Sequence, residues 1–230
     1  MEGIQALANL VDRNARLCIY DVGAHHGFVL AELLATFPNA EVYAFEPDAA
    51  NFAKLTARYG DTPRVRLFDV GLADRDGQAQ LHRNNYDATH SLLPMEPGAM
   101  NRWADASDVR EVAVQTVPVR SLDSLVSAGE TPWPDLVKLD MQGGEAMFLK
   151  GAENALRQQR ITGVLCEAEF VRLYRDQPTA WDIHGLFDGY GYKFVNFLDA
   201  KVRSGVMVWA DALYCSDAGW VRLEQQHAQS

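Results

Sequence analysis

Apolar and polar positions along the chain follow two periods in turn, one typical of buried strands and one typical of helices. Near-continuous apolar runs predict strands that are buried on both faces, at residues 17–22, 42–45, 65–70, 136–139, 161–167, 192–198 and 206–214. Apolar positions at helical spacing predict helices at residues 28–37, 48–59, 121–127, 145–158 and 179–188. Strands that alternate with helices are typical of the α/β class, and we predict a Rossmann-like, doubly wound, mostly parallel sheet of about seven strands.

The last two predicted strands are joined too closely for a crossover helix, so the sheet should finish with an antiparallel strand. Residues 75–118 break the alternation, and we expect them to form an insertion within one domain that spans residues 1–230. Inside the insertion, residues 78–82 and 111–119 have the pattern of a β-hairpin. Residues 84–107 are polar, rich in turn formers and without a clear period, which predicts a loop that covers a site.

Composition and charge narrow the class of protein. The 230 residues include 21 basic and 31 acidic side chains, a net charge of −10, which disfavours a protein that coats nucleic-acid phosphates. No apolar run approaches the roughly 18 residues that span a bilayer, and the N-terminus lacks the pattern of a secretory signal. The three cysteines, Cys18, Cys166 and Cys215, form no CxxC pair, which indicates reduced thiols. We therefore expect a cytoplasmic protein with no membrane span and no nucleic-acid partner.

In a doubly wound sheet, ligands bind outside the carboxyl ends of the strands, so the residues at these ends are candidates for a site. The first predicted strand ends in Asp21 and continues into a turn that includes Gly23, Ala24, His25 and Gly27. Glycines allow a tight turn and a close approach to a ligand. The GxGxxG spacing of dinucleotide sites is absent, and the acidic residue favours a ligand with positive charge over a pyrophosphate. A βα turn without a ligand is the alternative.

The next two predicted strands also end in acidic residues. Glu46, which precedes Pro47, is placed to accept hydrogen bonds from the two hydroxyls of a ribose, and the alternative is a carboxylate that stabilises a helix start. Asp69, which precedes Val70, could accept from the amine of an adenine, and the alternative is a surface acid. Together these strand ends predict a nucleoside ligand with a cationic, amine-bearing tail and no required phosphate. S-adenosylmethionine fits this description.

Several motifs along the chain resemble, in order, those of the FkbM-type methyltransferases. They are residues 21–27 (DVGAHHG), 45–47 (FEP), 71–74 (GLAD), 119–125 (VRSLDSL), 137–145 (VKLDMQGGE), Glu167 after a strand, and residues 211–214 (DALY). The resemblance implies a class I S-adenosylmethionine-dependent methyltransferase, usually one that acts on hydroxyls of sugars, glycolipids or natural products. One position departs from the family pattern, because asparagine is common where this chain has His25.

Methyl transfer to a hydroxyl benefits from a general base, and the acids that follow the fourth and fifth parallel strands are candidates. Asp140 lies where an acceptor would meet the methyl group, so we predict that it is the base or orients the acceptor hydroxyl, and that it also contacts the cofactor. Glu167 follows an apolar strand and is a second candidate acid. His90, in the expected cover loop, is an alternative base, although a solvated loop histidine has the same pattern.

Asp140, Glu167 and His184 could together hold a divalent metal, but their spacing matches no metal motif, so no metal site is predicted. The predicted function is methyl transfer from S-adenosylmethionine to a hydroxyl of a small molecule, sugar or glycan. The alternatives are methylation of an amine or amino sugar, an NAD-dependent oxidoreductase, and a nucleotide-binding module without catalysis.

Overall fold

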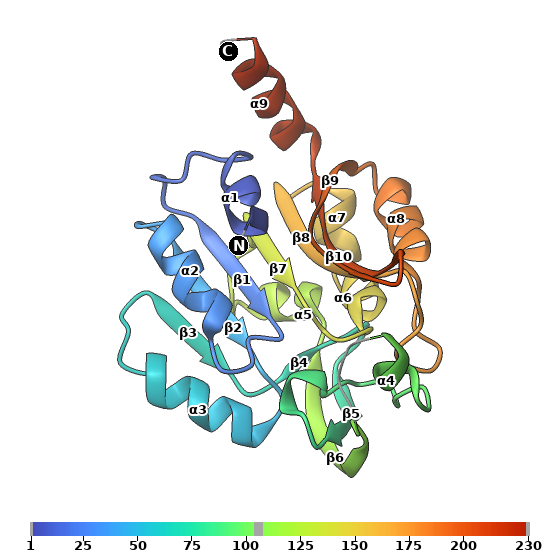
Figure 1. Cartoon of the computed structure of the whole chain (residues 1–230). Helices are drawn as coiled ribbons and strands as arrows, with labels where there is room; N and C mark the ends of the chain where they lie inside the picture. Colours follow the sequence, from blue (N-terminus) through green and yellow to red (C-terminus); the bar gives the residue numbers. More distant parts are fainter. Residues whose placement is uncertain (1, 104–107, 229–230) are drawn as a thin grey trace.

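The main sheet has seven strands in the order β3-β2-β1-β7-β8-β10-β9 in the computed structural model, which describes residues 2–103 and 108–228 (Figure 1). The strands are β1 (Cys18–Val22), β2 (Glu41–Phe45), β3 (Val65–Phe68), β7 (Leu136–Leu139), β8 (Gly163–Glu169), β9 (Lys193–Arg203) and β10 (Val206–Cys215). The first five of these are parallel, whereas β10 runs antiparallel to both β8 and β9. The predicted α/β class, the mostly parallel sheet of seven strands and its antiparallel last strand are confirmed.

Helices cover both faces of the main sheet, and each face has its own apolar core. One face is covered by α1 (Glu2–Ala8), α2 (Phe28–Thr36), α3 (Ala49–Tyr59) and α9 (Asp217–His227). The other face is covered by α5 (Leu122–Ser127), α6 (Glu145–Gly151), α7 (Glu153–Arg157) and α8 (Ala180–Gly189). Because both faces are buried, the central strands consist almost entirely of apolar residues, which explains the continuous apolar runs of the sequence.

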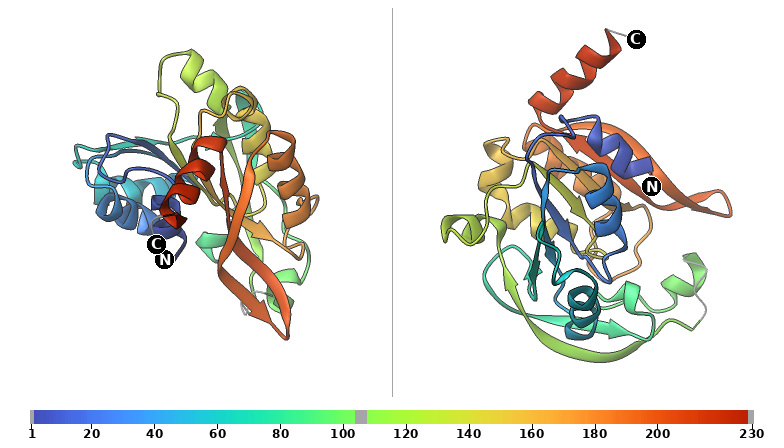
Figure 2. Two further views of the ribbon diagram at one scale, coloured as in Figure 1. Left: turned by 90° about the horizontal axis from the view of Figure 1, so that it is seen from above. Right: turned by 90° about the vertical axis from the view of Figure 1, so that its left-hand side faces the viewer.

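The predicted insertion forms a second, smaller sheet at the carboxyl edge of the main one (Figures 1 and 2). Its order is β4-β6-β5, with β4 (Gly71–Leu72), β5 (Gly77–Asn84) and β6 (Glu111–Arg120). The predicted hairpin is confirmed, since β5 and β6 pair antiparallel, and β4 adds a short parallel strand that the sequence did not predict. The expected cover loop contains the short helices η1 (Asp87–Thr89) and α4 (Ala99–Trp103), and residues 104–107 of it lie outside the described residues.

Some of the predicted boundaries were wrong. The helix predicted at 145–158 is two helices, because Ala152 leaves the helical conformation with φ −110° and ψ 19°. Gly151 lies so close to the carbonyl oxygen of Ala73 that a Cβ atom would come within 1.9 Å of it, which places the break where the helix crosses the chain near β4. The helices α1 and α9 were not predicted. Within the described residues, no helix has the length and apolar character needed to cross a membrane.

Candidate functional site

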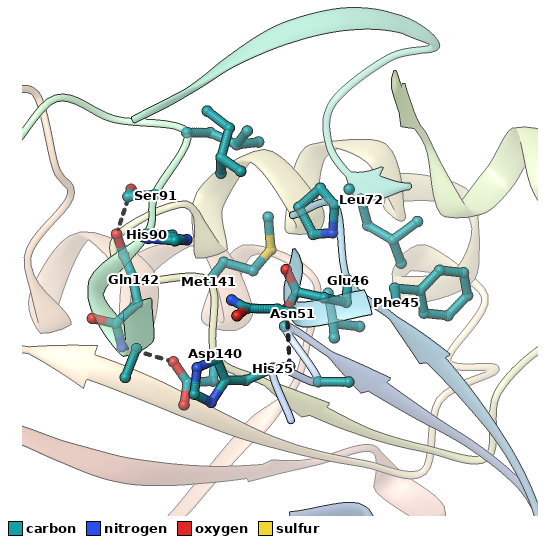
Figure 3. A pocket seen from close by; sticks show the side chains of 18 of the residues that line it. His25, Phe45, Glu46, Asn51, Leu72, His90, Ser91, Asp140, Met141 and Gln142 are labelled. Atoms are coloured by element: carbon teal, nitrogen blue, oxygen red, sulfur yellow. Dashed lines mark hydrogen bonds between the residues drawn. The ribbon is translucent and has the colours of Figure 1, made fainter. Parts of the chain in front are cut away.

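A cavity of about 190 Å³ opens where the carboxyl ends of β1, β2 and β7 face the second sheet (Figure 3). We call its two sides the strand-end wall, which consists of Gly23, Ala24, Glu46, Pro47 and Asp140, and the cover wall, which consists of Asp87, Ala88, His90, Ser91 and Leu92. The remaining lining residues are Val22, His25, Phe28, Val29, Phe45, Asn51, Gly71, Leu72, Leu81, Met141 and Gln142. The cavity therefore lies at the strand ends that the sequence indicated.

The turn after β1 is tight because two glycines adopt left-handed backbone conformations, with φ 80° at Gly23 and φ 77° at Gly27. The backbone N–H groups of Gly23 and Ala24 both donate to the carbonyl oxygen of Phe45, at 3.0 Å each. A Cβ atom on Gly23 would lie 1.8 Å from the carbonyl oxygen of Asp140. Glycine is therefore required at position 23 so that the turn, β2 and the end of β7 can approach one another.

Glu46 is held rigidly at the end of β2. Its Oε2 accepts a hydrogen bond from the backbone N–H of His25 at 2.9 Å (Figure 3), and its Oε1 accepts one from the backbone N–H of Asp48 at 2.8 Å. Each carboxylate oxygen can accept a further hydrogen bond, because each has a second lone pair. Burial raises the pKa of Glu46 to about 7, against the opposing effect of these two hydrogen bonds. Glu46 thus presents two fixed acceptors to the cavity.

Charge in the cavity lining is one-sided. The lining includes three carboxylates, those of Glu46, Asp87 and Asp140, whereas none of the described lining residues is a lysine or an arginine. Apolar side chains, among them Leu72, Leu81 and others from the second sheet and the cover wall, supply the rest of the surface. Such a lining suits a ligand with an apolar ring and a positive charge, and it offers no cationic side chain to a phosphate.

Asp140 belongs to a buried polar network below the cavity. The side-chain amide of Gln142 donates to Oδ1 of Asp140 at 2.9 Å and to Oε2 of Glu167 at 2.7 Å, so one amide joins the two carboxyl groups. Burial, together with the charge of Asp140, raises the pKa of Glu167 well above its ordinary value. Glu167 is therefore easier to protonate than an exposed glutamate. Of these two acids, Asp140 lines the cavity and Glu167 lies behind it.

Lys138 is the buried cation of this network. Its Nζ lies 3.7 Å from Oδ2 of Asp140 and 3.5 Å from Oδ1 of Asp211, and the residue is 3% exposed. Burial opposes the charge of the ammonium, but the surrounding carboxylates outweigh burial and raise the pKa of Lys138 above its ordinary value. Asp21 also lies in this network. Burial raises its pKa to about 7, and its Oδ2 has no hydrogen-bond partner among the described residues.

Side-chain hydrogen bonds connect the segment of the cover wall to Gln142, which in turn holds Asp140 of the strand-end wall. Ser91 Oγ donates to the backbone carbonyl of Gln142 at 2.7 Å (Figure 3), and the hydroxyl of Tyr174 contacts Gln142 Oε1 at 2.8 Å and the carbonyl of Thr89 at 3.2 Å. His90 is buried within the wall. Its Nε2 lies 3.1 Å from the carbonyl oxygen of Asn84 and its Nδ1 lies 3.6 Å from Oδ2 of Asp48, so both ring nitrogens face acceptor atoms of the protein.

The structure brings most of the predicted site residues to one cavity. Seven of them line it, namely Gly23, Ala24, His25, Glu46, Pro47, His90 and Asp140. Asp21 and Gly27 lie next to the turn but outside the lining, and Glu167 joins the site through Gln142. Asp69 and Val70 follow the end of β3 at Phe68 and are outside the lining, because Gly71 and Leu72 form that part of the wall.

His184 does not join Asp140 and Glu167. It lies on α8 with its ring 6.1 Å from the rings of Phe194 and Tyr214, so it packs among aromatic side chains on the helix-covered face. In the described part of the chain, the only group of three metal-binding side chains whose ligand atoms lie within 4.8 Å of one another is His25, His26 and Asp87. Asp140, Glu167 and His184, the three metal ligands considered from the sequence, therefore do not come together in the structure.

Sequence reasoning did not identify several residues of the site. Gln142 carries one available signal, since it lies two positions after Asp140 and before the Gly143–Gly144 pair, in a turn where it adopts φ 52°. Lys138 stands inside an apolar strand, which is unusual for a lysine and marks a paired charge. Asn51, Asp87, Ser91 and Tyr174 reach the cavity or its wall only through the tertiary fold, and they have no local signal.

The comparison with protein families decides the relationship of this chain. The methyltransferase FkbM domain model matches residues 21–194. The chain belongs to this family. The match covers the strand-end wall, the cover wall and the network around Asp140, and it confirms the resemblance seen in the sequence.

Two curated relatives agree with the family. The 2-O-methyltransferase NoeI of Sinorhizobium fredii is 28% identical over 162 residues, which cover 69% of this chain and 66% of that protein. The hexuronic acid methyltransferase AglP of Haloferax volcanii is 31% identical over 140 residues, which cover 60% of this chain and 51% of that protein. The FkbM-family chain thus spans about half to two thirds of the length of these relatives.

A solved structure shares the fold of this FkbM-family chain. The magnesium protoporphyrin IX methyltransferase of Synechocystis, with bound S-adenosylmethionine, superposes with a TM-score of 0.50 at 12% identity, over 94% of this chain and 78% of that one. At this identity the likeness concerns the arrangement of helices and strands, and it supports the Rossmann-like architecture described above.

Proposed function

We propose that this FkbM-family chain transfers the methyl group of S-adenosylmethionine to a hydroxyl of a sugar or glycan. The observation that carries the proposal is the lining of the cavity, where three carboxylates and an apolar surface lie at the ends of parallel strands without a lysine or arginine among the described lining residues. A pyrophosphate-containing cofactor such as NAD would place two negative charges in this lining, whereas a sulfonium cation is favoured there.

The residues present fit this cofactor. Glu46 offers two fixed oxygens to the vicinal hydroxyls of a ribose, and it is already oriented by the N–H groups of His25 and Asp48. The apolar side chains of Leu72 and Leu81 suit an adenine ring. Asp140 lies in the lining next to the tight turn, where its carboxylate can attract the amine and the positive charge of the methionine portion.

When bound, S-adenosylmethionine supplies an activated methyl group on a positively charged sulfur. Asp140 orients the acceptor hydroxyl and accepts its proton as the new oxygen–carbon bond forms. Gln142 fixes the position of the Asp140 carboxylate, because its amide donates to Oδ1 and is itself held by Glu167 and Tyr174. Lys138, whose Nζ lies 3.7 Å from Oδ2, gives the Asp140 carboxylate a buried ion-pair partner. Exclusion of water by the cover wall would complete the site.

The choice of acceptor rests on the relatives. One is named for methyl transfer to an oxygen, and the other is named for a hexuronic acid. On that likeness we propose a sugar or glycan hydroxyl, bound between the cover wall and the loop that follows β8.

Isothermal titration calorimetry with the purified chain tests the cofactor. We expect binding of S-adenosylmethionine and S-adenosylhomocysteine and no measurable binding of NAD. The titration is run at pH 8, above the pKa of about 7 of Glu46, so that the side chain is ionised. Glu46→Gln then replaces one charged acceptor by an amide donor, and it should weaken binding of S-adenosylmethionine by about 10- to 100-fold, since hydrogen bonds to charged groups contribute roughly 1.5–3 kcal/mol. Glu41→Gln, on the exposed start of the same strand, is the matched control and should leave the affinity unchanged.

Turnover tests the reaction. Release of S-adenosylhomocysteine is measured with a panel of uronic acids, neutral sugars and amino sugars, and the site of methylation is read by mass spectrometry. Methylation of a sugar hydroxyl is expected. Binding of NAD with no response to S-adenosylmethionine would contradict the proposed cofactor, and methylation confined to the nitrogen of amino sugars would contradict the proposed acceptor.

A further inference from the structure

Two adjacent histidines of the β1 turn meet an aspartate of the cover wall at the edge of the cavity. His25 Nε2 lies 3.2 Å from Oδ1 of Asp87, and His26 Nε2 lies 3.1 Å from Oδ2 of the same carboxylate. The two imidazole rings stack with their centroids 3.6 Å apart and an interplanar angle of 16°. Three potential metal ligands, all within 4.8 Å of one another, therefore come from two segments about sixty positions apart in the chain.

The positively charged side chain of Lys54 already lies beside two of these three residues, His26 and Asp87. The ammonium of Lys54 lies 3.0 Å from His26 Nε2 and 3.0 Å from Oδ2 of Asp87. The side chain of Lys54 is 51% exposed, so it can leave toward solvent without uncovering a core. The amide oxygen of Asn51 lies 3.1 Å from the same nitrogen of His26 and adds an oxygen donor within reach.

The backbone holds one ligand in an unusual conformation. His25 has φ 50°, the left-handed region that costs a non-glycine residue energy and is found at ligand clamps and active sites. Its Nε2 is buried and makes no hydrogen bond among the described residues that meets ordinary geometry. The turn therefore aims an imidazole nitrogen at Asp87 and leaves that nitrogen available to a ligand.

We propose that His25, His26 and Asp87 form a site for a divalent transition metal of the Zn²⁺ class. Two imidazole nitrogens with one carboxylate are a ligand set that Zn²⁺, Co²⁺ and Ni²⁺ bind, and three protein ligands leave a coordination position open. The metal replaces the ammonium of Lys54 beside His26 and Asp87, and the His25 ring rotates out of its stack with His26 so that both Nε2 atoms reach the ion. It joins the cofactor turn to the cover wall, and so it fastens the cover wall over the cavity.

Spectroscopic titration of the metal-free full chain with Co²⁺ tests the site without cofactor or acceptor. We expect visible absorption bands of protein-bound Co²⁺ at one equivalent, which Zn²⁺ removes by displacement. Asp87→Asn and His26→Gln should each weaken Co²⁺ binding by about tenfold or more, because each removes a ligand. Lys54→Met should strengthen binding by about tenfold, because the competing ammonium is gone. The matched control is His82→Gln. His82, on β5, pairs with Glu111 of β6, and this variant should bind Co²⁺ like the wild type.

The opposite directions expected for Lys54→Met and Asp87→Asn separate ligation from misfolding, since a damaged fold cannot raise the affinity. Circular dichroism of each variant confirms that the fold is kept. The proposal is overturned if wild type shows no bound Co²⁺, if binding appears only in Lys54→Met, or if His82→Gln loses as much affinity as Asp87→Asn. Because no turnover is measured, these outcomes are independent of whether the chain methylates a sugar.

Discussion

The two walls of the cavity hold their carboxylates in opposite ways. In the strand-end wall, burial raises the pKa of Glu46 to about 7, and the acid is fixed by backbone N–H groups. In the cover wall, burial is a smaller obstacle, and the contacts with Lys54 and His25 lower the pKa of Asp87 to about 2. The first wall is thus a rigid part of the sheet with acidic groups available to a positive ligand, whereas the carboxylate of the second wall is already paired with Lys54 of α3.

The largest effect expected from this comparison concerns the base. Asp140→Asn removes the proton acceptor in the strand-end wall, and kcat for the sugar acceptor should fall by about 10²- to 10⁴-fold. His90→Gln, its counterpart in the cover wall, should lower kcat by less than about tenfold, because both ring nitrogens of His90 face protein acceptors. Steady-state kinetics at saturating S-adenosylmethionine measures both.

The exposed Asp61, in the turn that follows α3, provides the control for a loss of one negative charge. Asp61→Asn should leave kcat unchanged. If His90→Gln costs more than Asp140→Asn, the base lies in the cover wall and the assignment of the two walls is reversed.

The next effect is on stability as a function of pH. The folded protein keeps a proton on Glu46 up to about pH 7, while the unfolded chain releases it near its ordinary value of about 4.3. This stabilisation is complete below the unfolded value and is lost as the pH rises through 7, and for one such group it amounts to on the order of 3 kcal/mol. The free energy of unfolding without ligand, measured by urea titration from pH 4 to 8, should therefore fall over this range.

Asp87 should act in the opposite sense and at lower pH. Its pKa is lowered, so its stabilisation is present above the unfolded value of about 3.9 and is lost as the pH falls toward 2. Solvent screening reduces this contribution, since a third of the Asp87 side chain is exposed. Glu46→Gln should make the fall above pH 4 shallower, with Asp21 supplying what remains, and should leave the dependence below pH 4 unchanged. A pH profile that Glu46→Gln does not alter would contradict the buried, protonated state of Glu46.

The smallest effect concerns the hydroxyl of Tyr174, which connects the segment of the cover wall to Gln142. Tyr174 is fully buried, and its hydroxyl contacts Gln142, which holds Asp140 of the strand-end wall, and the carbonyl of Thr89, which lies between residues of the cover wall. Tyr174→Phe should lower the free energy of unfolding by about 1–2 kcal/mol, because Gln142 Oε1 loses the donor closest to it while the Thr89 carbonyl keeps the amide of Asn84. Tyr86, three positions before Thr89, is 55% exposed and provides the control. Tyr86→Phe should change the free energy of unfolding by less than about 0.5 kcal/mol. Equal changes in the free energy of unfolding for the two substitutions would show that the connection does not depend on the hydroxyl of Tyr174.

The difference between the strand-end wall and the cover wall also explains which parts of the molecule could be predicted from the sequence. The strands of the main sheet are buried on both faces, so their apolar runs identify them, and parallel order brings Asp21, Glu46 and Asp140 to one edge. The cover wall has no such pattern, because its position depends on single contacts such as Ser91 with Gln142. The two-residue strand β4 is too short to give a period, and the predicted helix at 145–158 divides because of a close approach to Ala73 that only the tertiary fold contains.

The second sheet also makes the insertion exchangeable as a unit. The insertion leaves the main fold after β4 and returns at the end of β6. These two points are adjacent, because Gly71 pairs with Val119 and the N–H of Ala73 donates to the carbonyl of Arg120 at 2.8 Å. A segment whose ends meet can be replaced by a longer or shorter one at little cost in loop entropy. The same strand-end wall can therefore serve different acceptors when a different insertion joins the main fold at these two adjacent points and makes its own contacts with residues near Gln142 and Tyr174.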